Sequence, residues 1–250
     1  MSKGLKNSVI IVTGAAQGIG RSVAKTLANS GAAILLADIQ ASKLADVEAE
    51  LTHDGHRVAT AKVDITDTAQ TAEMAAVAIR RFGRIDGLVC CAGIDAQPGL
   101  AWEIDEAHWR RMVDVDLSGT WWCVKAVIPA MMKQRSGRIV LISSTSARTG
   151  GRKSSPAYSA AKAGLLGLTV SLSLQLEEYG ILINAVTPGA TGSTGTEMSD
   201  AEKRSYLADY PLGFGGPQPV ADAVTYLLGS SGDWISGTVL NVSGGRWRGI

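Results

Sequence analysis

The chain has 250 residues, and its 24 Lys and Arg against 23 Asp and Glu give a formal net charge of +1 with histidine neutral. This near balance, without a long basic block, excludes a protein that binds nucleic acid through a strongly positive surface. The longest apolar runs are far shorter than the ~20 residues of a membrane-spanning helix, so we expect no membrane partner.

Seven short apolar runs alternate with longer amphipathic segments along the chain. The runs are nearly continuous in Val, Ile, Leu and Ala, which is typical of parallel strands buried on both faces. The alternation predicts an α/β chain forming one domain over residues 1–250, a doubly wound Rossmann fold whose seven-stranded parallel sheet has helices on both faces. The predicted strands are 8–13, 32–38, 57–64, 85–91, 137–143, 181–187 and 237–242, and the predicted helices are 18–30, 41–53, 67–82, 105–135, 157–179 and 217–229.

The first predicted strand leads into the turn Thr13-Gly14-Ala15-Ala16-Gln17-Gly18-Ile19-Gly20. Glycines let a backbone approach a phosphate, and the N-terminus of the following helix offers free N–H groups and a partial positive charge. The spacing differs from the better-known G-x-G-x-x-G pattern. Glycines also end strands for purely structural reasons, so the turn alone does not identify a dinucleotide site.

Asp38 ends the second predicted strand, 18 residues after Gly20. A carboxylate at this distance can accept hydrogen bonds from both ribose hydroxyls of a dinucleotide and would repel a 2′-phosphate. The next residues, Ile39 and Gln40, supply no cation for such a phosphate. The cofactor predicted from this pattern is NAD, and the alternative is that Asp38 is a solvated acid at a strand end.

Two features follow in the third and fourth predicted strands. Asp64 and Ile65 end the third strand, where they can contact an adenine. Cys90 and Cys91 lie in the apolar fourth strand and are expected to be small buried side chains. Together with Cys123 they cannot all pair, and their spacing matches no metal site, so we predict no metal and a reducing, cytoplasmic setting.

Tyr158 and Lys162 are four residues apart, so on a helix they share one face. Tyrosine has an ordinary pKa near 10 and is a poor base at neutral pH, but a neighbouring ammonium favours the phenolate. Ser144, after the fifth strand, can hydrogen-bond a substrate oxygen beside this tyrosine. Each piece alone is common. The order of strand, serine and helix-borne Tyr and Lys, downstream of a dinucleotide turn, indicates proton and hydride transfer.

The longest irregular segment is 188–216, which is rich in Gly, Ser and Thr and contains a possible short helix at 199–208. Because loops of this length in compact domains are usually functional, we expect a lid over the substrate.

From Val9 to Gly245 the chain resembles the short-chain dehydrogenase/reductase family. The matching elements are the turn at 13–20, Asp38, Asp64, Ala92-Gly93, Ser144, Tyr158, Lys162, Asn184, Pro188-Gly189 and the ending 235–245. The resemblance implies NAD(P)-dependent alcohol and carbonyl chemistry in which Ser144 orients the substrate and Tyr158 is the acid/base. It implies that Lys162 binds the nicotinamide ribose and that Thr191 lies near the nicotinamide amide. The expected cofactor contacts are Gly14, Gln17, Gly18, Ile19, Gly20, Asp38, Asp64, Ile65, Cys90, Gly93, Tyr158, Lys162, Pro188, Gly189 and Thr191.

The chain departs from the family pattern after the fourth strand and in the fourth helix. Cys90-Cys91 stand where the family usually has Asn-Asn, and a thiol cannot replace the hydrogen bonds of an amide. Asp116 stands where the family has an Asn that is thought to hold a water in a proton relay to Lys162. An ionised Asp accepts hydrogen bonds but does not donate them, so Asp116 either pairs with Lys162 and holds the water, or the relay is absent.

The spacing between serine and tyrosine is the third departure. Ser144 and Tyr158 are 14 residues apart, where 13 is the commonest spacing in the family. Either the intervening loop carries one extra residue, or Thr145 is the hydroxyl that orients the substrate. We favour Ser144.

The substrate pocket is expected to form from 94–102, 145–155 and 188–212. Three basic residues in or near the middle segment either bind an anionic substrate group or are solvated. An acid and a tryptophan in the first segment would suit a polyol or sugar. The basic residues are Arg148, Arg152 and Lys153, and the other two are Asp95 and Trp102.

The predicted helix 105–135 is rich in large apolar side chains. They pack either against a symmetry mate or within the subunit core, and because the family is usually tetrameric we expect a homotetramer. These residues are Trp109, Met112, Trp121, Trp122, Met131 and Met132.

The sequence therefore predicts an NAD-dependent oxidoreductase acting on a secondary alcohol, with sugars, polyols and hydroxy acids as candidate substrates. A 3-oxoacyl thioester reductase shares nearly all of these motifs, although Asp38 argues against the NADPH that such reductases generally use. A non-catalytic NAD-binding sensor or scaffold is a third hypothesis, supported only by Asp116 and Cys90.

Overall fold

The computed structural model describes residues 5–94, 99–150, 155–192, 199–208 and 210–248. Asp95, Arg152 and Lys153, and parts of the expected lid at 188–216, lie outside these ranges. Among the helices that the structure describes, none is long and apolar enough to cross a membrane.

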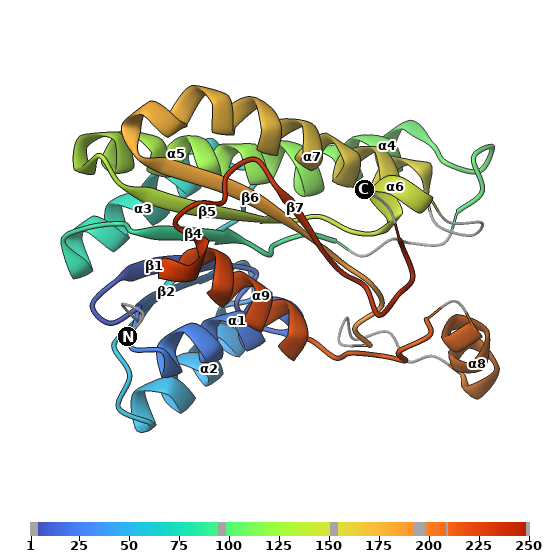
Figure 1. Cartoon of the computed structure of the whole chain (residues 1–250), viewed down its shortest axis with the longest axis horizontal. Helices are drawn as coiled ribbons and strands as arrows, with labels where there is room; N and C mark the ends of the chain where they lie inside the picture. Colours follow the sequence, from blue (N-terminus) through green and yellow to red (C-terminus); the bar gives the residue numbers. More distant parts are fainter. Residues whose placement is uncertain (1–4, 95–98, 151–154, 193–198, 209, 249–250) are drawn as a thin grey trace.

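Seven parallel strands form one sheet in the order β3-β2-β1-β4-β5-β6-β7 (Figure 1). The predicted fold class is confirmed. The strands are β1 (Val9–Thr13), β2 (Ala33–Asp38), β3 (Val58–Lys62), β4 (Gly87–Cys90), β5 (Gly137–Ile142), β6 (Ile181–Pro188) and β7 (Val239–Val242).

Helices cover both faces of the sheet (Figure 1). One face carries α1 (Gly18–Asn29), α2 (Ala41–His53) and α9 (Gln218–Leu228). The other carries α3 (Thr68–Phe82), α4 (Glu106–Val113), α5 (Thr120–Gln134) and α7 (Pro156–Leu176). Two shorter helices are α6 (Ser146–Thr149) and α8 (Asp200–Ala208), and 3-10 turns span Glu177–Tyr179 and Ser230–Gly232.

The two covered faces explain why the strands read as continuous apolar runs. In β1, Ile10 and Val12 belong to the core beneath α1, α2 and α9, whereas Ile11 belongs to the core beneath α3, α5 and α7. Successive side chains of a strand point to opposite faces, so every side chain of a strand that is covered on both sides faces an apolar core.

The segment predicted as one helix over 105–135 is interrupted by a π-helical turn, Asp114–Gly119, between α4 and α5. A π turn holds one more residue than an α turn and is frequently found at functional sites. Here it contains Asp116, whose side chain is completely buried. The apolar periodicity of the sequence could not reveal the turn, because one extra residue shifts the helical face only locally.

The loops after β1 and β4 meet at the edge of the sheet where the strand order reverses, which is the usual ligand site of a doubly wound fold. Thr13 Oγ1 accepts a hydrogen bond from Ala92 N at 3.2 Å. Gly14 has φ +67°, and a Cβ on it would lie 2.7 Å from Ala92 N. Glycine is therefore required at position 14 both by conformation and by the close approach of the second loop.

Candidate active site

The glycine-rich turn between β1 and α1 is anchored by Asp38. Its Oδ2 accepts a hydrogen bond from Ala16 N at 3.0 Å, and its Oδ1 accepts one from Gln40 N at 2.9 Å. The Asp38 residue is only 8% exposed, so it is not the solvated acid of the alternative interpretation. Its fixed carboxylate lies at the carboxyl end of β2, beside the turn.

The N-terminus of α1 has no capping side chain. Gln17 occupies the N-cap position without making a capping hydrogen bond, and no acidic residue lies in the first turn. The Gln17 side chain instead accepts a hydrogen bond at 2.7 Å from Lys43 Nζ of α2. Lys43 was missed by sequence reasoning, which considered only the residues next to Asp38, and contact across two helices leaves no signal in the local pattern.

Asp64 and Ile65 have structural roles after β3. Asp64 Oδ1 accepts hydrogen bonds from the backbone N and the hydroxyl of Thr66, which closes the turn that leads to α3. Ile65 is buried in the core beneath α3 and α5. The next turn ends at Asp67, which caps α3 through Ala69 N and Gln70 N, as its position before the helix predicts.

Three consecutive hydroxyl residues follow β5, and the structure distinguishes them. Ser143 is buried and donates its hydroxyl to Lys162 O at 2.8 Å, which ties β5 to α7. Thr145 is also buried, and its N–H donates to Pro188 O. Ser144 is half-buried, and its Oγ accepts a hydrogen bond from Ser146 N at 3.1 Å.

Tyr158 and Lys162 lie one turn apart near the start of α7, as predicted. The Lys162 ammonium lies 5.7 Å from the centre of the Tyr158 ring. Lys162 Nζ donates to Ile142 O at 3.3 Å and pairs with Asp116 Oδ1 at 3.1 Å. Asp116 Oδ1 also accepts from Ile94 N at 3.2 Å, so one carboxylate oxygen joins the segment after β4, the π turn and α7.

Burial and pairing act against each other on this ion pair. Burial raises the pKa of the Asp116 carboxyl, and the ammonium of Lys162 opposes that rise only in part. Burial alone would lower the pKa of Lys162, but Asp116 and Tyr158 raise it by more, so it lies above its ordinary value. The second carboxylate oxygen, Asp116 Oδ2, is buried and has no hydrogen-bond partner among the residues that the structure describes. Lys162 therefore stays charged at neutral pH.

Gly93 packs directly on this ion pair. A Cβ at position 93 would overlap Asp116 Oδ1 and lie 3.2 Å from Lys162 Nζ. Cys91 lies close to the same ammonium, yet burial raises the pKa of its thiol to about 12, and burial also raises the pKa of Cys90. The residues in place of the family's Asn-Asn are therefore neutral thiols.

The loop after β6 completes this end of the sheet. Gly189 N donates to Val242 O, and a Cβ on Gly189 would lie 2.8 Å from the Tyr210 ring and 2.9 Å from Ser243 Cα. Pro188 is the last residue of β6, and Thr191 follows it as a half-buried residue.

The structure also describes Arg148 and Trp102, two of the residues that the sequence suggested for substrate binding. Arg148 on α6 stacks over the ring of Trp247 at 4.7 Å. Trp102 is 81% exposed and lies just before α4.

The chain is similar over nearly its whole length to known oxidoreductases. A family model described as short chain dehydrogenase matches residues 8–205. A dehydrogenase subunit of Thauera aromatica, named for a hydroxy(phenyl)methyl derivative of succinyl-CoA, is 37% identical, with 97% of this chain and 98% of that protein covered. The cis-4-hydroxycyclohexanecarboxylate dehydrogenase of Sinomonas cyclohexanicum is 36% identical, with 98% of both chains covered.

Two further similarities bear on cofactor and substrate. The 3-oxoacyl-acyl-carrier-protein reductase of Escherichia coli is 34% identical, with 97% of this chain and 98% of that protein covered. A solved 7α-hydroxysteroid dehydrogenase, complexed with NADH and 7-oxo glycochenodeoxycholic acid, matches with a TM-score of 0.91 at 29% identity. That match covers 97% of this chain and 95% of the other.

The packing of Gly93 on the ion pair predicts opposite effects for two Gly→Ala substitutions. Gly93→Ala should lower the free energy of unfolding by about 1–3 kcal/mol, because the new methyl must push apart Asp116 and Lys162. Gly167→Ala is the matched control on α7, where a Cβ meets no described atom of the same subunit within 4 Å. It should raise stability by about 0.5–1 kcal/mol, as expected for an unstrained helix position. Urea unfolding of both variants tests this, and a Gly93→Ala protein as stable as wild type would contradict the packing.

Proposed function

The chain belongs to the short-chain dehydrogenase family, and from that premise we propose that it transfers a hydride between a secondary alcohol and NAD, with Tyr158 as the acid/base. The observation that carries the proposal is the buried ammonium of Lys162, held by Asp116 and Ile142 O beside the Tyr158 ring. A cation in that position stabilises the phenolate that a tyrosine needs in order to act as a base.

Each catalytic side chain has a distinct task. Tyr158 takes the proton of the substrate hydroxyl during oxidation and returns it during reduction. Ser144 donates its hydroxyl hydrogen to the substrate oxygen, since its own Oγ is held by Ser146 N. Lys162 keeps its charge through its pairing with Asp116 and supports the phenolate. Burial of Thr145 supports Ser144 as the orienting hydroxyl.

The residues of the turn fit a dinucleotide. Gly14 and Gly18 have positive φ, and the N-terminus of α1 is uncapped, so its N–H groups are available to a pyrophosphate. When bound, NAD supplies the hydride acceptor. The residues proposed to hold it are Gly14, Gln17, Gly18, Ile19, Gly20, Asp38, Asp64, Ile65, Cys90, Gly93, Tyr158, Lys162, Pro188, Gly189 and Thr191.

The proposed substrate is a secondary alcohol that carries a carboxylate or an acyl group. The support is the names of two relatives, one for a succinyl-CoA derivative and one for a hydroxycyclohexanecarboxylate. Similarity to a 3-oxoacyl-acyl-carrier-protein reductase keeps the thioester reductase as a second candidate. The fixed carboxylate of Asp38 argues against it, because it disfavours the 2′-phosphate of NADPH.

The three cysteines take no part in the proposed chemistry. They are unpaired, and burial raises the pKa of Cys91 and Cys123 to about 12, so they are not nucleophiles at neutral pH. Unpaired thiols persist in reducing compartments, which supports the proposed cytoplasmic location.

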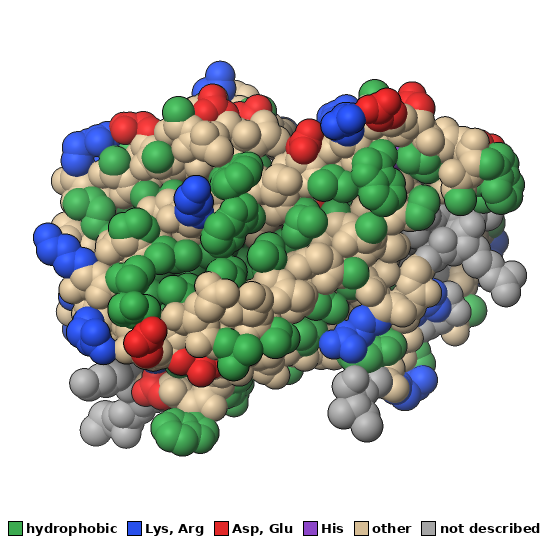
Figure 2. Space-filling model, turned by 90° about the horizontal axis from the view of Figure 1, so that it is seen from above, with side chains coloured by type: hydrophobic (Ala, Val, Ile, Leu, Met, Phe, Trp, Pro, Cys, Tyr) green, Lys and Arg blue, Asp and Glu red, His purple; other side chains and the backbone are tan. Residues whose placement is uncertain are grey.

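We further propose a homotetramer in which α4, α5 and α7 contribute one interface. Met112 and Met131 are buried within the subunit, but Trp109, Val170 and Leu174 are exposed. Figure 2 shows hydrophobic side chains gathered on this side of the molecule. Exposed apolar surface of this kind usually marks a contact with another chain. Sedimentation equilibrium tests the assembly, and a monomer at micromolar concentration would rule it out.

Turnover of a panel of secondary alcohols and 3-oxoacyl thioesters with each cofactor tests the proposed function. Oxidation of hydroxy acids with NAD is the expected result. Preferential reduction of thioesters with NADPH would favour the second candidate. Cofactor binding without turnover of any substrate would favour a non-catalytic NAD-binding protein.

Asp38 predicts that NAD binds at least about tenfold more tightly than NADP, because its carboxylate accepts from the ribose hydroxyls and repels a 2′-phosphate. Asp38→Asn with Ile39→Arg should remove this preference, since Ile39 is exposed and the amide oxygen can still accept from Ala16 N. Isothermal titration of both cofactors measures it. Asp46→Ala, an exposed change on α2, is the control and should keep the wild-type ratio; equal affinities in the wild-type protein would refute the assignment.

Asp116→Asn should keep kcat within about tenfold, roughly 1.4 kcal/mol in barrier, because the amide oxygen can still accept from Lys162. The loss of one negative charge makes the surroundings of Tyr158 more positive and favours its phenolate. The rising limb of the kcat–pH profile for alcohol oxidation should therefore move to lower pH.

The neighbouring Asp114→Asn is the matched control, since it removes the same charge from an exposed position of the same turn. Its profile should match that of wild type. If the Asp116→Asn profile also superimposes on wild type, Asp116 has no part in the proton chemistry.

A further inference from the structure

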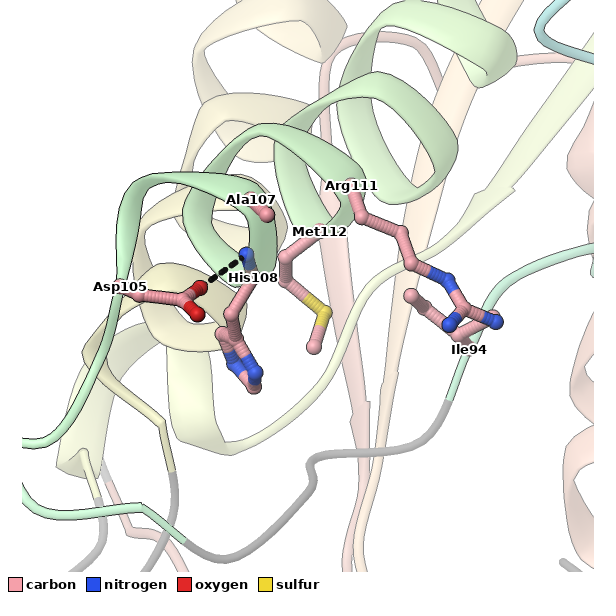
Figure 3. A pocket seen from close by; sticks show the side chains of 6 residues that line it. All are labelled: Ile94, Asp105, Ala107, His108, Arg111 and Met112. Carbon is pink, nitrogen blue, oxygen red and sulfur yellow. Dashed lines mark hydrogen bonds between the residues drawn. The ribbon is translucent and has the colours of Figure 1, made fainter.

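A pocket of about 280 Å³ lies between α4 and the segment that follows β4 (Figure 3). Its size is near the lower end of the roughly 300–1,000 Å³ typical of small-ligand sites, which suits one end of a small molecule rather than a whole cofactor. It is lined by Ile94, Asp105, Ala107, His108, Arg111 and Met112. Apart from Ile94, these residues come from a part of the chain that sequence reasoning did not assign to the substrate.

The pocket combines cationic and apolar groups. Figure 3 shows the Met112 side chain between the ring of His108 and the guanidinium of Arg111, with Ile94 beside the guanidinium. Asp105 is the acid in the lining, and its Oδ1 already accepts from His108 N at 2.7 Å. Arg111 and His108 therefore offer hydrogen-bond donors to an anion, and the apolar side chains of Met112 and Ile94 lie beside them.

Arg111 differs from its neighbour Arg110. Arg110 pairs with Glu106 at 2.6 Å on the exposed face of α4. Within the described ranges of the chain, no carboxylate pairs with Arg111. An arginine that lines a pocket and is not paired with a carboxylate of the protein can bind the carboxylate of a ligand through two parallel hydrogen bonds.

The tautomer of His108 sets which of its two ring nitrogens can donate to an anion. Ser155 Oγ accepts from Ala157 N at 3.2 Å and lies 2.9 Å from His108 Nε2. When Ser155 donates its hydroxyl hydrogen to His108 Nε2, the neutral ring carries its proton on Nδ1. His108 Nδ1–H is the second donor available to an anion.

Two contacts place the pocket next to the catalytic residues. Ile94, in its lining, donates its N–H to Asp116 Oδ1, the partner of Lys162. His108 meets Ser155, which caps α7 three residues before Tyr158. A molecule in the pocket therefore lies against both segments that hold the ion pair and the tyrosine.

We propose that this pocket binds the carboxylate of the substrate, with Arg111 as its cation, His108 as a second donor, and Ile94 and Met112 against the apolar body. The inference rests on the proposed alcohol oxidation and narrows its substrate class to hydroxy acids whose carboxylate lies across an apolar body from the hydroxyl. A 4-hydroxycyclohexanecarboxylate has this form, because the ring separates its two groups.

The test compares cis-4-hydroxycyclohexanecarboxylate with its methyl ester as substrates of the full chain with NAD. In Arg111→Met, the ratio of kcat/KM for the acid to kcat/KM for the ester should fall about 10- to 100-fold, the usual effect of losing hydrogen bonds to a charged group. The change should appear mainly in the KM for the acid. Arg110→Met removes the same charge from the same helix and should leave the ratio unchanged.

Arg148→Met tests the other candidate for an anionic substrate group. If it lowers the acid-to-ester ratio and Arg111→Met does not, the pocket is not the carboxylate site. If wild type oxidises other alcohols but prefers the ester to the acid, the inference fails while the proposed function stands.

A binding measurement decides the case in which neither compound is oxidised. Titration with cyclohexanecarboxylate should then show binding to wild type that is at least about tenfold weaker in Arg111→Met. Equal binding to both proteins, or no binding to wild type, overturns the inference. Failure of the whole alcohol panel overturns the proposed function separately.

Discussion

The site depends on one constraint, the burial of the Lys162 ammonium beneath the sheet edge. A buried charge must be paired and hydrogen-bonded, and losing one partner of such a pair costs about 3–5 kcal/mol. Asp116 and Ile142 O meet this requirement. The π turn is the local distortion that contains Asp116, and Gly93 is the residue whose missing side chain leaves room for the pair. The π turn, the segment after β4 and α7 are therefore held together around the charge of Lys162.

The glycine-rich turn proposed to bind the cofactor lies at the same edge of the sheet. Buried polar side chains hold this turn in place too. Asp38 is buried and holds the turn through Ala16 N, while Thr13 holds the loop after β4 through Ala92 N. The backbone of both loops is thus fixed by hydrogen bonds to side chains. Preorganisation of this kind lets the N-terminus of α1 meet a phosphate without further ordering of the chain.

The sequence predicted those features that depend on local pattern. The seven strands followed from apolar runs, because each strand is buried on both faces, and the pairing of Tyr158 with Lys162 followed from helical spacing. The choice between Ser144 and Thr145 needed the structure, because it depends on which hydroxyl is buried. The π turn escaped detection, because its extra residue hardly alters the apolar periodicity.

Contacts between distant segments were the least predictable. Lys43 reaches Gln17 from another helix, and His108 reaches Ser155 across 47 residues. Neither pair has a spacing that any motif describes. Pairing of Asp116 with Lys162 was one of the two alternatives that the sequence left open, and the structure shows this pair. The second role of the same carboxylate oxygen, as acceptor for Ile94 N, emerged only from the packing.

The central claim is that Tyr158 moves the proton. The ammonium of Lys162, which pairs with Asp116, keeps Tyr158 able to do so. Substitution of Tyr158 by Phe removes one hydroxyl and keeps the ring, so kcat and NAD affinity can be measured on a protein with the same packing. The account predicts that kcat falls by about 10²- to 10⁴-fold while the Kd for NAD stays near that of wild type. A Tyr158→Phe protein with near wild-type turnover would contradict it.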